Sequence, residues 1–204
     1  MKLILFLCYF IYITFFSRGL IVVLNKYFKK NFPVDEDSLF GIKIFYFYPI
    51  LTLFLFGNIG FILNFFIPVN VSIALFLSPI LLANFLKKIE IKFNLIELLV
   101  FGTSLFAGFV GVQSLGFHYD SGLYHLNSQY FINSQKIIFG HVNLFFQYGF
   151  SSIVEYLGSI HWIGDNLVLL SFIQVPFFIL LFNILCTFII NSESVHIKFS
   201  SICV

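Results

Sequence analysis

Long apolar runs separated by short polar connectors dominate this 204-residue chain. Runs of this kind approach or exceed the roughly 20 residues that a helix needs to cross the hydrocarbon of a bilayer. The pattern therefore predicts an all-α fold, a polytopic helical membrane protein in which residues 1–204 form a single transmembrane domain. About five spans are expected, at residues 3–24, 40–66, 71–86, 95–112 and 167–190.

Glycine, proline and one arginine interrupt these apolar runs. Pro49 and the group Gly57–Gly60 are the predicted kink points of the second span, which is longer than a bilayer requires. Arg18 lies near the predicted end of the first span, where we expect its side chain to snorkel to the interface. Small residues favour close helix packing, so the fourth span should approach a neighbour along its glycines, Gly102, Gly108 and Gly111.

A polar stretch, Phe117–Ser152, stands out between the fourth and fifth spans, inside a loop of residues 113–166. Within it, Ser121–Ile138 has helical periodicity, with Asp120 as a suitable N-cap. The predicted amphipathic helix lies flat on the membrane surface. Its apolar side carries Leu123, Leu126, Tyr130 and Ile137, and its polar side carries Ser121, His125, Ser128 and Gln129.

The remaining polar residues of the loop give weaker signals. Glu155, His161 and Asp165 are expected to be solvated loop residues. Trp162 is expected at the level of the lipid headgroups, where amphipathic aromatic rings are favoured. No metal or other cofactor is predicted, because the polar stretch has no metalloenzyme spacing such as HExxH. The candidate ligands of a metal site in this stretch would be His118, Asp120, His125 and His141.

Composition agrees with a membrane protein and excludes other classes. Hydrophobic residues make up 60% of the chain and charged residues 10%, against about 25% charged in soluble domains. A net charge of +2 without a basic cluster excludes nucleic acid as a partner. The three cysteines are widely spaced and form no CxxC, which argues against a disulfide framework or a zinc site.

Lysines in the connectors set the predicted orientation. Lys87, Lys88 and Lys92 follow the third span, and the positive-inside rule places that connector in the cytoplasm. The loop of residues 113–166 then faces outward. The expected location is the inner (plasma) membrane, in multi-pass form.

The polar stretch contains the block Tyr119-Asp120-Ser121-Gly122-Leu123-Tyr124-His125-Leu126, followed by Asn143-Leu144 and then Gly149-Phe150-Ser151-Ser152. These blocks resemble a family of bacterial multi-pass membrane glycosyltransferases of the GT-C type, which act in surface-polysaccharide assembly. The resemblance covers roughly residues 95–190. Similar proteins have about twice as many spans, so we expect this chain to correspond to the N-terminal part of a longer one.

The resemblance implies a site and its partners. Asp120 would be the catalytic carboxylate, and the substrate-binding residues would be Tyr119, Tyr124, His125 and Asn143. The implied partners are the lipid bilayer, a polyprenyl-phosphate sugar donor and a glycan or lipid-linked acceptor. From the residues alone, Asp120 as a simple helix cap remains equally open.

The alternative function is a non-catalytic membrane component of the same glycan pathway: a polymerase, a flippase-like carrier or a scaffold. A carrier would need charged residues within its spans. The predicted spans hold almost none beyond Arg18, Lys43 and Glu97, which disfavours the carrier. A membrane anchor without activity is the third hypothesis.

Overall fold

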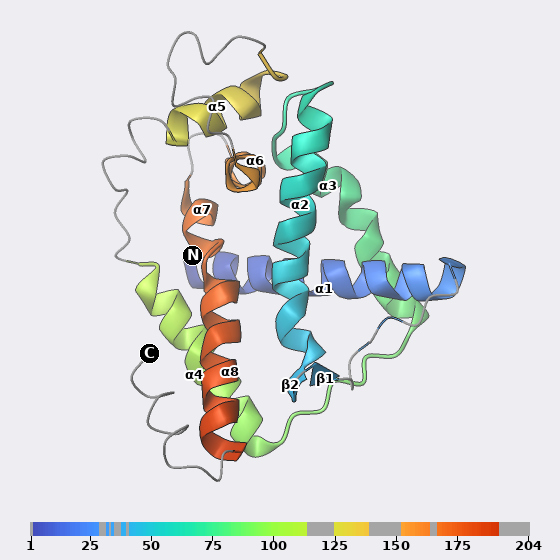
Figure 1. Ribbon diagram of the computed structural model, residues 1–204, viewed down its shortest axis with the longest axis vertical. Coiled ribbons are helices and arrows are strands. Elements are labelled where there is room, and N and C mark those ends of the chain that lie inside the picture. The colour runs from blue at the N-terminus through green and yellow to red at the C-terminus, as the bar shows by residue number, and fades with distance from the viewer. Residues whose placement is uncertain are drawn as a thin grey trace. The chain divides into compact units, whose positions relative to one another are not determined.

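The computed structural model describes residues 2–28, 32, 34, 38–39, 41–113, 125–138, 152–163 and 167–191. These residues are mostly helical (Figure 1). The elements are α1 (Lys2–Phe28), β1 (Ser38–Leu39), β2 (Ile42–Lys43), the 3-10 helix η1 (Ile44–Phe47), α2 (Tyr48–Asn64), α3 (Val71–Leu77), the 3-10 helix η2 (Ser78–Leu86), α4 (Leu95–Gly111), α5 (Leu126–Ser134), α6 (Ile153–Ile160), α7 (Val168–Phe172) and α8 (Val175–Asn191).

The chain forms two compact units, which we describe separately. The first unit comprises Met1–Ile50, Leu81–Ser114 and Gln174–Val204. The second unit comprises Leu51–Ile80 and Leu115–Ile173.

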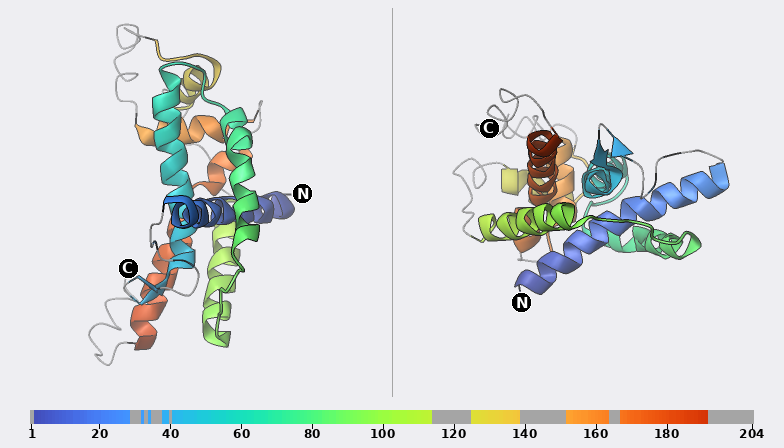
Figure 2. Two further views of the ribbon diagram at one scale, coloured as in Figure 1. Left: turned by 90° about the vertical axis from the view of Figure 1, so that its right-hand side faces the viewer. Right: turned by 90° about the horizontal axis from the view of Figure 1, so that it is seen from below.

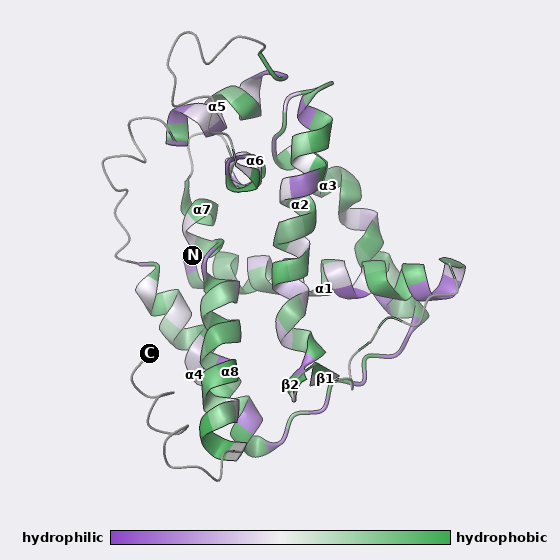
Figure 3. Ribbon diagram, in the orientation of Figure 1, coloured by the Kyte–Doolittle hydropathy of each residue, from purple (hydrophilic) through white to green (hydrophobic). Residues whose placement is uncertain are grey.

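The helical fold class is confirmed, and the apolar character of the helices is plain when they are coloured by hydropathy (Figure 3). Three helical stretches are long and apolar enough to cross a membrane: Lys2–Phe28, Ile44–Asn64 and Val168–Ile190. Two other predicted spans form shorter apolar helices, Val71–Leu86 and Leu95–Gly111. The number of five spans therefore stays a prediction.

Helical structure begins at Ile44, four residues after the predicted start of the second span. Residues before Ile44 form a short antiparallel hairpin, with Ser38 opposite Lys43 and Leu39 opposite Ile42. Gly41, in its turn, has a φ of 77°, a left-handed conformation that side chains other than glycine rarely adopt. Helical structure begins only after this hairpin, because the turn points the chain away from a helical path.

In the first unit, α4 and α8 lie side by side (Figures 1 and 2). Gly108 makes this approach possible, since a Cβ on it would lie 2.7 Å from Cγ1 of Val175. Gly102 and Gly111 face open space. The close approach predicted from the glycines of this helix is thus confirmed at Gly108 alone. Along the same helix, Phe109 and Phe101 pack against aromatic rings of α1, from Phe6 and Phe10 respectively.

Arg18 is buried within the protein, and polar groups of the chain surround its guanidinium. α1 continues for ten residues beyond Arg18, and its side chain is fully buried. Its guanidinium donates hydrogen bonds to Oδ1 of Asn84, at 2.9 Å, and to the backbone carbonyls of Lys87 and Lys88, at 3.4 and 3.0 Å. The carbonyls at a helix end have no partner within the helix, and a buried cation satisfies them.

In the second unit, α6 packs against both α5 and α3. Gly57 and Gly60 of α2 allow α6 to pack closely against α2. A Cβ on Gly60 would lie 3.3 Å from side-chain atoms of both Tyr156 and Ile160. α2 is helical from Tyr48 to Asn64, through both glycines. The predicted kink points therefore serve for close packing.

A helix is present within the range predicted for the amphipathic helix, but it is shorter than predicted. α5 ends at Ser134, and Gln135 is already extended (φ −141°, ψ 155°). The side-chain amide of Asn64 donates a 2.9 Å hydrogen bond to the Gln135 carbonyl. The backbone carbonyl of Asn64 accepts a hydrogen bond from the Ile137 N–H at 2.8 Å. These bonds hold the segment after Ser134 in extended form.

One residue expected on the polar side of this helix, Gln129, faces inward. Gln129 and Ile132 are buried, whereas Tyr130 is exposed. The predicted cap Asp120 and residues 121–124 lie outside the described residues.

Candidate functional site

His125 is the one predicted site residue that falls among the described residues. The others, Asp120, Tyr119, Tyr124 and Asn143, lie outside them. We therefore build the site outward from His125, which immediately precedes the first residue of α5.

The Nδ1 atom of His125 contacts Oε1 of Glu155, thirty residues further along the chain. Only a protonated Nδ1 can donate to a carboxylate oxygen, so this contact fixes the position of one ring proton. Glu155 stands in the first turn of α6, where a carboxylate interacts favourably with the helix dipole. Its side chain is only 5% exposed, whereas that of His125 is 45% exposed.

Helical spacing on both elements produces this contact. Glu155 and Gly158 are three residues apart on one face of α6, and His125 and Gln129 are four apart on one face of the α5 segment. A Cβ on Gly158 would lie 2.5 Å from Cδ of Gln129. The amide of Gln129 thus lies directly on the backbone of α6, one turn from the imidazole–carboxylate contact.

Two buried oxygen atoms at this interface have no hydrogen-bond partner among the described residues. They are Oε2 of Glu155 and Oε1 of Gln129. A buried polar atom without a partner costs about 1–3 kcal/mol, and more when it is charged. The interface between α5 and α6 is therefore energetically expensive at this point.

The rest of α6 is anchored by satisfied hydrogen bonds. Ser159 donates its hydroxyl proton to the carbonyl of Val69, and Nδ2 of Asn133 donates to the Ser159 carbonyl at 3.0 Å. His161 donates from Nδ1 to the carbonyl of Leu157 at 2.7 Å. Burial lowers the pKa of His161 to about 4, so its imidazole is neutral at pH 7.

The prediction that Glu155 and His161 are solvated loop residues is wrong. Each residue is 4% exposed, Glu155 on α6 and His161 immediately after it. The sequence did contain a signal for this helix. Ser152-Ile153-Val154-Glu155 has the Ser-x-x-Glu pattern typical of a helix start, and it places Glu155 in the first turn.

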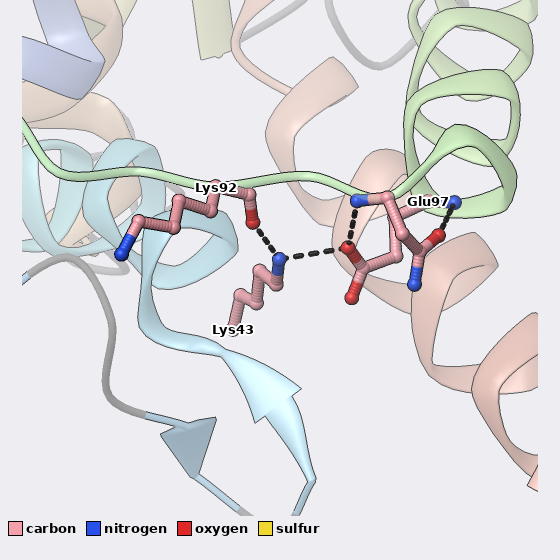
Figure 4. A network of polar contacts seen from close by, with 4 residues as sticks. Lys43, Lys92 and Glu97 are labelled. Atoms are coloured by element: carbon pink, nitrogen blue, oxygen red, sulfur yellow. Dashed lines mark hydrogen bonds and ion pairs between the residues drawn. The ribbon is translucent and has the colours of Figure 1, made fainter.

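A second acid–base pair lies in the first unit (Figure 4). Nζ of Lys43 is 2.7 Å from Oε2 of Glu97 and also contacts the carbonyl of Lys92. Asn94 and Glu97 form a reciprocal capping box at the start of α4, with two bonds of 2.8 Å. Each partner here has a clear structural task, and both side chains reach solvent.

No group of three or more metal-ligating side chains occurs in the part of the chain that the structure describes. Of the ligands considered from the sequence, His118, Asp120 and His141 lie outside that part. No protein-family model, no curated protein and no solved structure matches the chain.

Proposed function

We propose that the chain is a GT-C-like membrane glycosyltransferase, or part of one, which uses a polyprenyl-phosphate-linked sugar in cell-surface polysaccharide biosynthesis. The observation that carries the proposal is the contact of His125 with Glu155. His125 belongs to the block Tyr119–Leu126 that resembles this family. A half-exposed imidazole backed by a buried carboxylate is an arrangement that active sites use to orient a histidine.

The proposed reaction needs one base. A hydroxyl oxygen of the acceptor attacks the anomeric carbon of the donor sugar, and the bond from that carbon to the phosphate oxygen breaks. The phosphate oxygen keeps the electron pair, and Asp120 takes the hydroxyl proton. His125, with Tyr119, Tyr124 and Asn143, would hold the substrates.

Two features of the chain are compatible with a lipid-linked donor. Three helices of the described residues are long and apolar enough to cross a membrane. In the first unit, a groove of about 470 Å³ runs along α4 and α8 and is lined mainly by apolar side chains such as Val175 and Phe178. Such a groove can hold part of a polyprenyl chain. The proposed location is the inner membrane, with the loop of residues 113–166 outside.

The second candidate is a non-catalytic membrane component of the same pathway. It is favoured by the fact that the contact between His125 and Glu155 also fastens α5 to α6. In that case the pair would have a structural role and would contact no substrate.

Substitution of Asp120 separates the two candidates. Asn caps a helix about as well as Asp but cannot take a proton, so Asp120→Asn should leave membrane insertion intact and lower product formation by about 10²-fold or more. Glycan product is measured in vesicles supplied with polyprenyl-phosphate sugars, and Glu90→Gln, an exposed carboxylate of another connector, is the control. Wild-type product from a well-inserted Asp120→Asn protein would reject the catalytic proposal.

A further inference from the structure

The contact at the interface of α5 and α6 joins an accessible group to an inaccessible one. Glu155 is almost completely buried, so it can touch a substrate only through another group. His125 keeps nearly half of its side chain exposed. We propose that Glu155 is a positioning residue, which orients the imidazole of His125 for contact with the substrate. This inference rests on the transferase function proposed above.

The orientation follows from the chemistry of imidazole. When Nδ1 donates its proton to Glu155, the Nε2 atom lies on the opposite edge of the ring. A free histidine exchanges between two tautomers and several rotamers, whereas this contact selects one tautomer and one ring position. A fixed ring loses less entropy on contact with a sugar hydroxyl or a phosphate oxygen than a freely rotating one.

Stability alone gives a poor account of this arrangement. Oε2 of Glu155 and Oε1 of Gln129 are buried acceptors without hydrogen-bond partners among the described residues. Well-packed apolar side chains of similar volume are often as stable as a buried ion pair, or more stable. Natural proteins keep such costly buried groups mainly at functional sites. Here the buried carboxylate lies beside His125, a residue of the family-like block.

Gln129 and Gly158 support the same orientation. Gln129 lies on Gly158, and any larger residue at 158 would displace its amide. α5 can therefore approach α6 closely enough for His125, one helical turn before Gln129, to reach the carboxylate. Three features of the interface thus converge on the imidazole: the carboxylate, the glycine and the helical spacing.

The test compares Glu155→Gln with a matched ion-pair control, Glu97→Gln, in the full chain reconstituted in lipid vesicles. Glutamine keeps the shape of the side chain but can present its amide group to Nδ1, which selects the wrong tautomer. We expect kcat to fall roughly 10–100-fold in Glu155→Gln, the size seen when a group that orients a histidine is lost. KM for the acceptor and the melting temperature should change little, and Glu155→Asp should recover part of kcat.

Two further readouts exclude a structural role. The ¹⁵N spectrum of His125 should show protonated Nδ1 in the wild type and a changed tautomer in Glu155→Gln. His125→Asn should lower kcat, and the double variant should be no slower than His125→Asn alone, because Glu155 acts through His125.

Each outcome decides the inference. Unchanged kcat in a folded Glu155→Gln protein, or a loss of melting temperature that accounts for the lost product, overturns the positioning role while the transferase function stands. An inactive wild type overturns the proposed function and the positioning role together. A loss of kcat equal to that of Glu97→Gln also overturns the positioning role.

Discussion

Two acid–base pairs within the described part of the chain differ in what surrounds them. Lys43 and Glu97, in the first unit, are both accessible to solvent, and Glu97 also accepts the backbone N–H of Asn94. His125 and Glu155, in the second unit, meet where the carboxylate is buried and its second oxygen has no partner among the described residues. The first pair therefore costs little free energy. The second pair costs more, because it buries a carboxylate oxygen that has no hydrogen-bond partner among the described residues.

This difference indicates which of the two pairs is the better candidate for a functional role. An exposed pair at a helix start contributes little energy and is readily explained by capping and by attachment of neighbouring segments. Burial of an incompletely paired carboxylate opposes folding, so its presence calls for another advantage. The second unit is therefore the better place to look for chemistry.

The largest expected effect comes from removal of His125, and removal of Lys43, the basic partner in the other pair, serves as its comparison. His125→Leu leaves a buried carboxylate without its contact and should lower the free energy of unfolding by about 4 kcal/mol. Lys43→Met should cost about 0.5 kcal/mol, because Glu97 keeps solvent and the Asn94 N–H. Denaturant unfolding in detergent micelles, followed by circular dichroism, measures both. The double variant His125→Leu/Glu155→Leu should regain most of the loss. Equal losses for the two single variants would remove the contrast between the pairs.

The next effect is a pH dependence that arises in the second unit. Folding buries His161 and lowers its pKa from 6.5 to about 4, so between these values the unfolded state binds the extra proton. The free energy of unfolding is highest above pH 6.5 and decreases progressively as the pH falls towards 4, by about 3 kcal/mol in total. Unfolding curves between pH 4 and pH 8 measure it. His161→Asn should flatten this part of the profile, and an unchanged profile would contradict the burial of a neutral imidazole.

The smallest effect is a difference in stability between two alanine substitutions, one at a glycine packed against another helix and one at a glycine that faces open space. A Cβ at Gly57 would overlap Cγ2 of Ile153 and lie 3.0 Å from its carbonyl oxygen, so Gly57→Ala should destabilise by about 2 kcal/mol. Gly102 faces open space within α4, and Gly102→Ala should stabilise by about 0.5–1 kcal/mol through helix propensity. Melting temperatures in micelles should move in opposite directions. A gain in stability from Gly57→Ala would show that α6 does not rest on α2 as described.

Much of the helical layout follows from the sequence. The ranges predicted for the first, third, fourth and fifth spans lie within a few residues of the observed helices, because a helix satisfies the backbone hydrogen bonds of a long apolar run within the run itself. The start of the second span was placed too early, because Gly41 adopts a turn that hydropathy does not reveal.

The candidate site was only partly predictable. His125 was selected by its place in the family-like block, and the Ser-x-x-Glu pattern could have indicated the helix that carries Glu155. Nothing local shows that these two residues meet. Their contact depends on the packing of α5 against α6, and that packing also turned the face of Gln129 inward.

The sequence by itself determined the helical fold class, because the length and apolar character of each run are properties of single segments. It also determined which residues are chemically able to act. The tertiary structure decided which polar groups are buried together: Arg18 with the end of η2, and Glu155 with His125. The physical reason is that the cost of a buried charge depends on neighbours distant in the chain, and only folding brings those neighbours within hydrogen-bond distance.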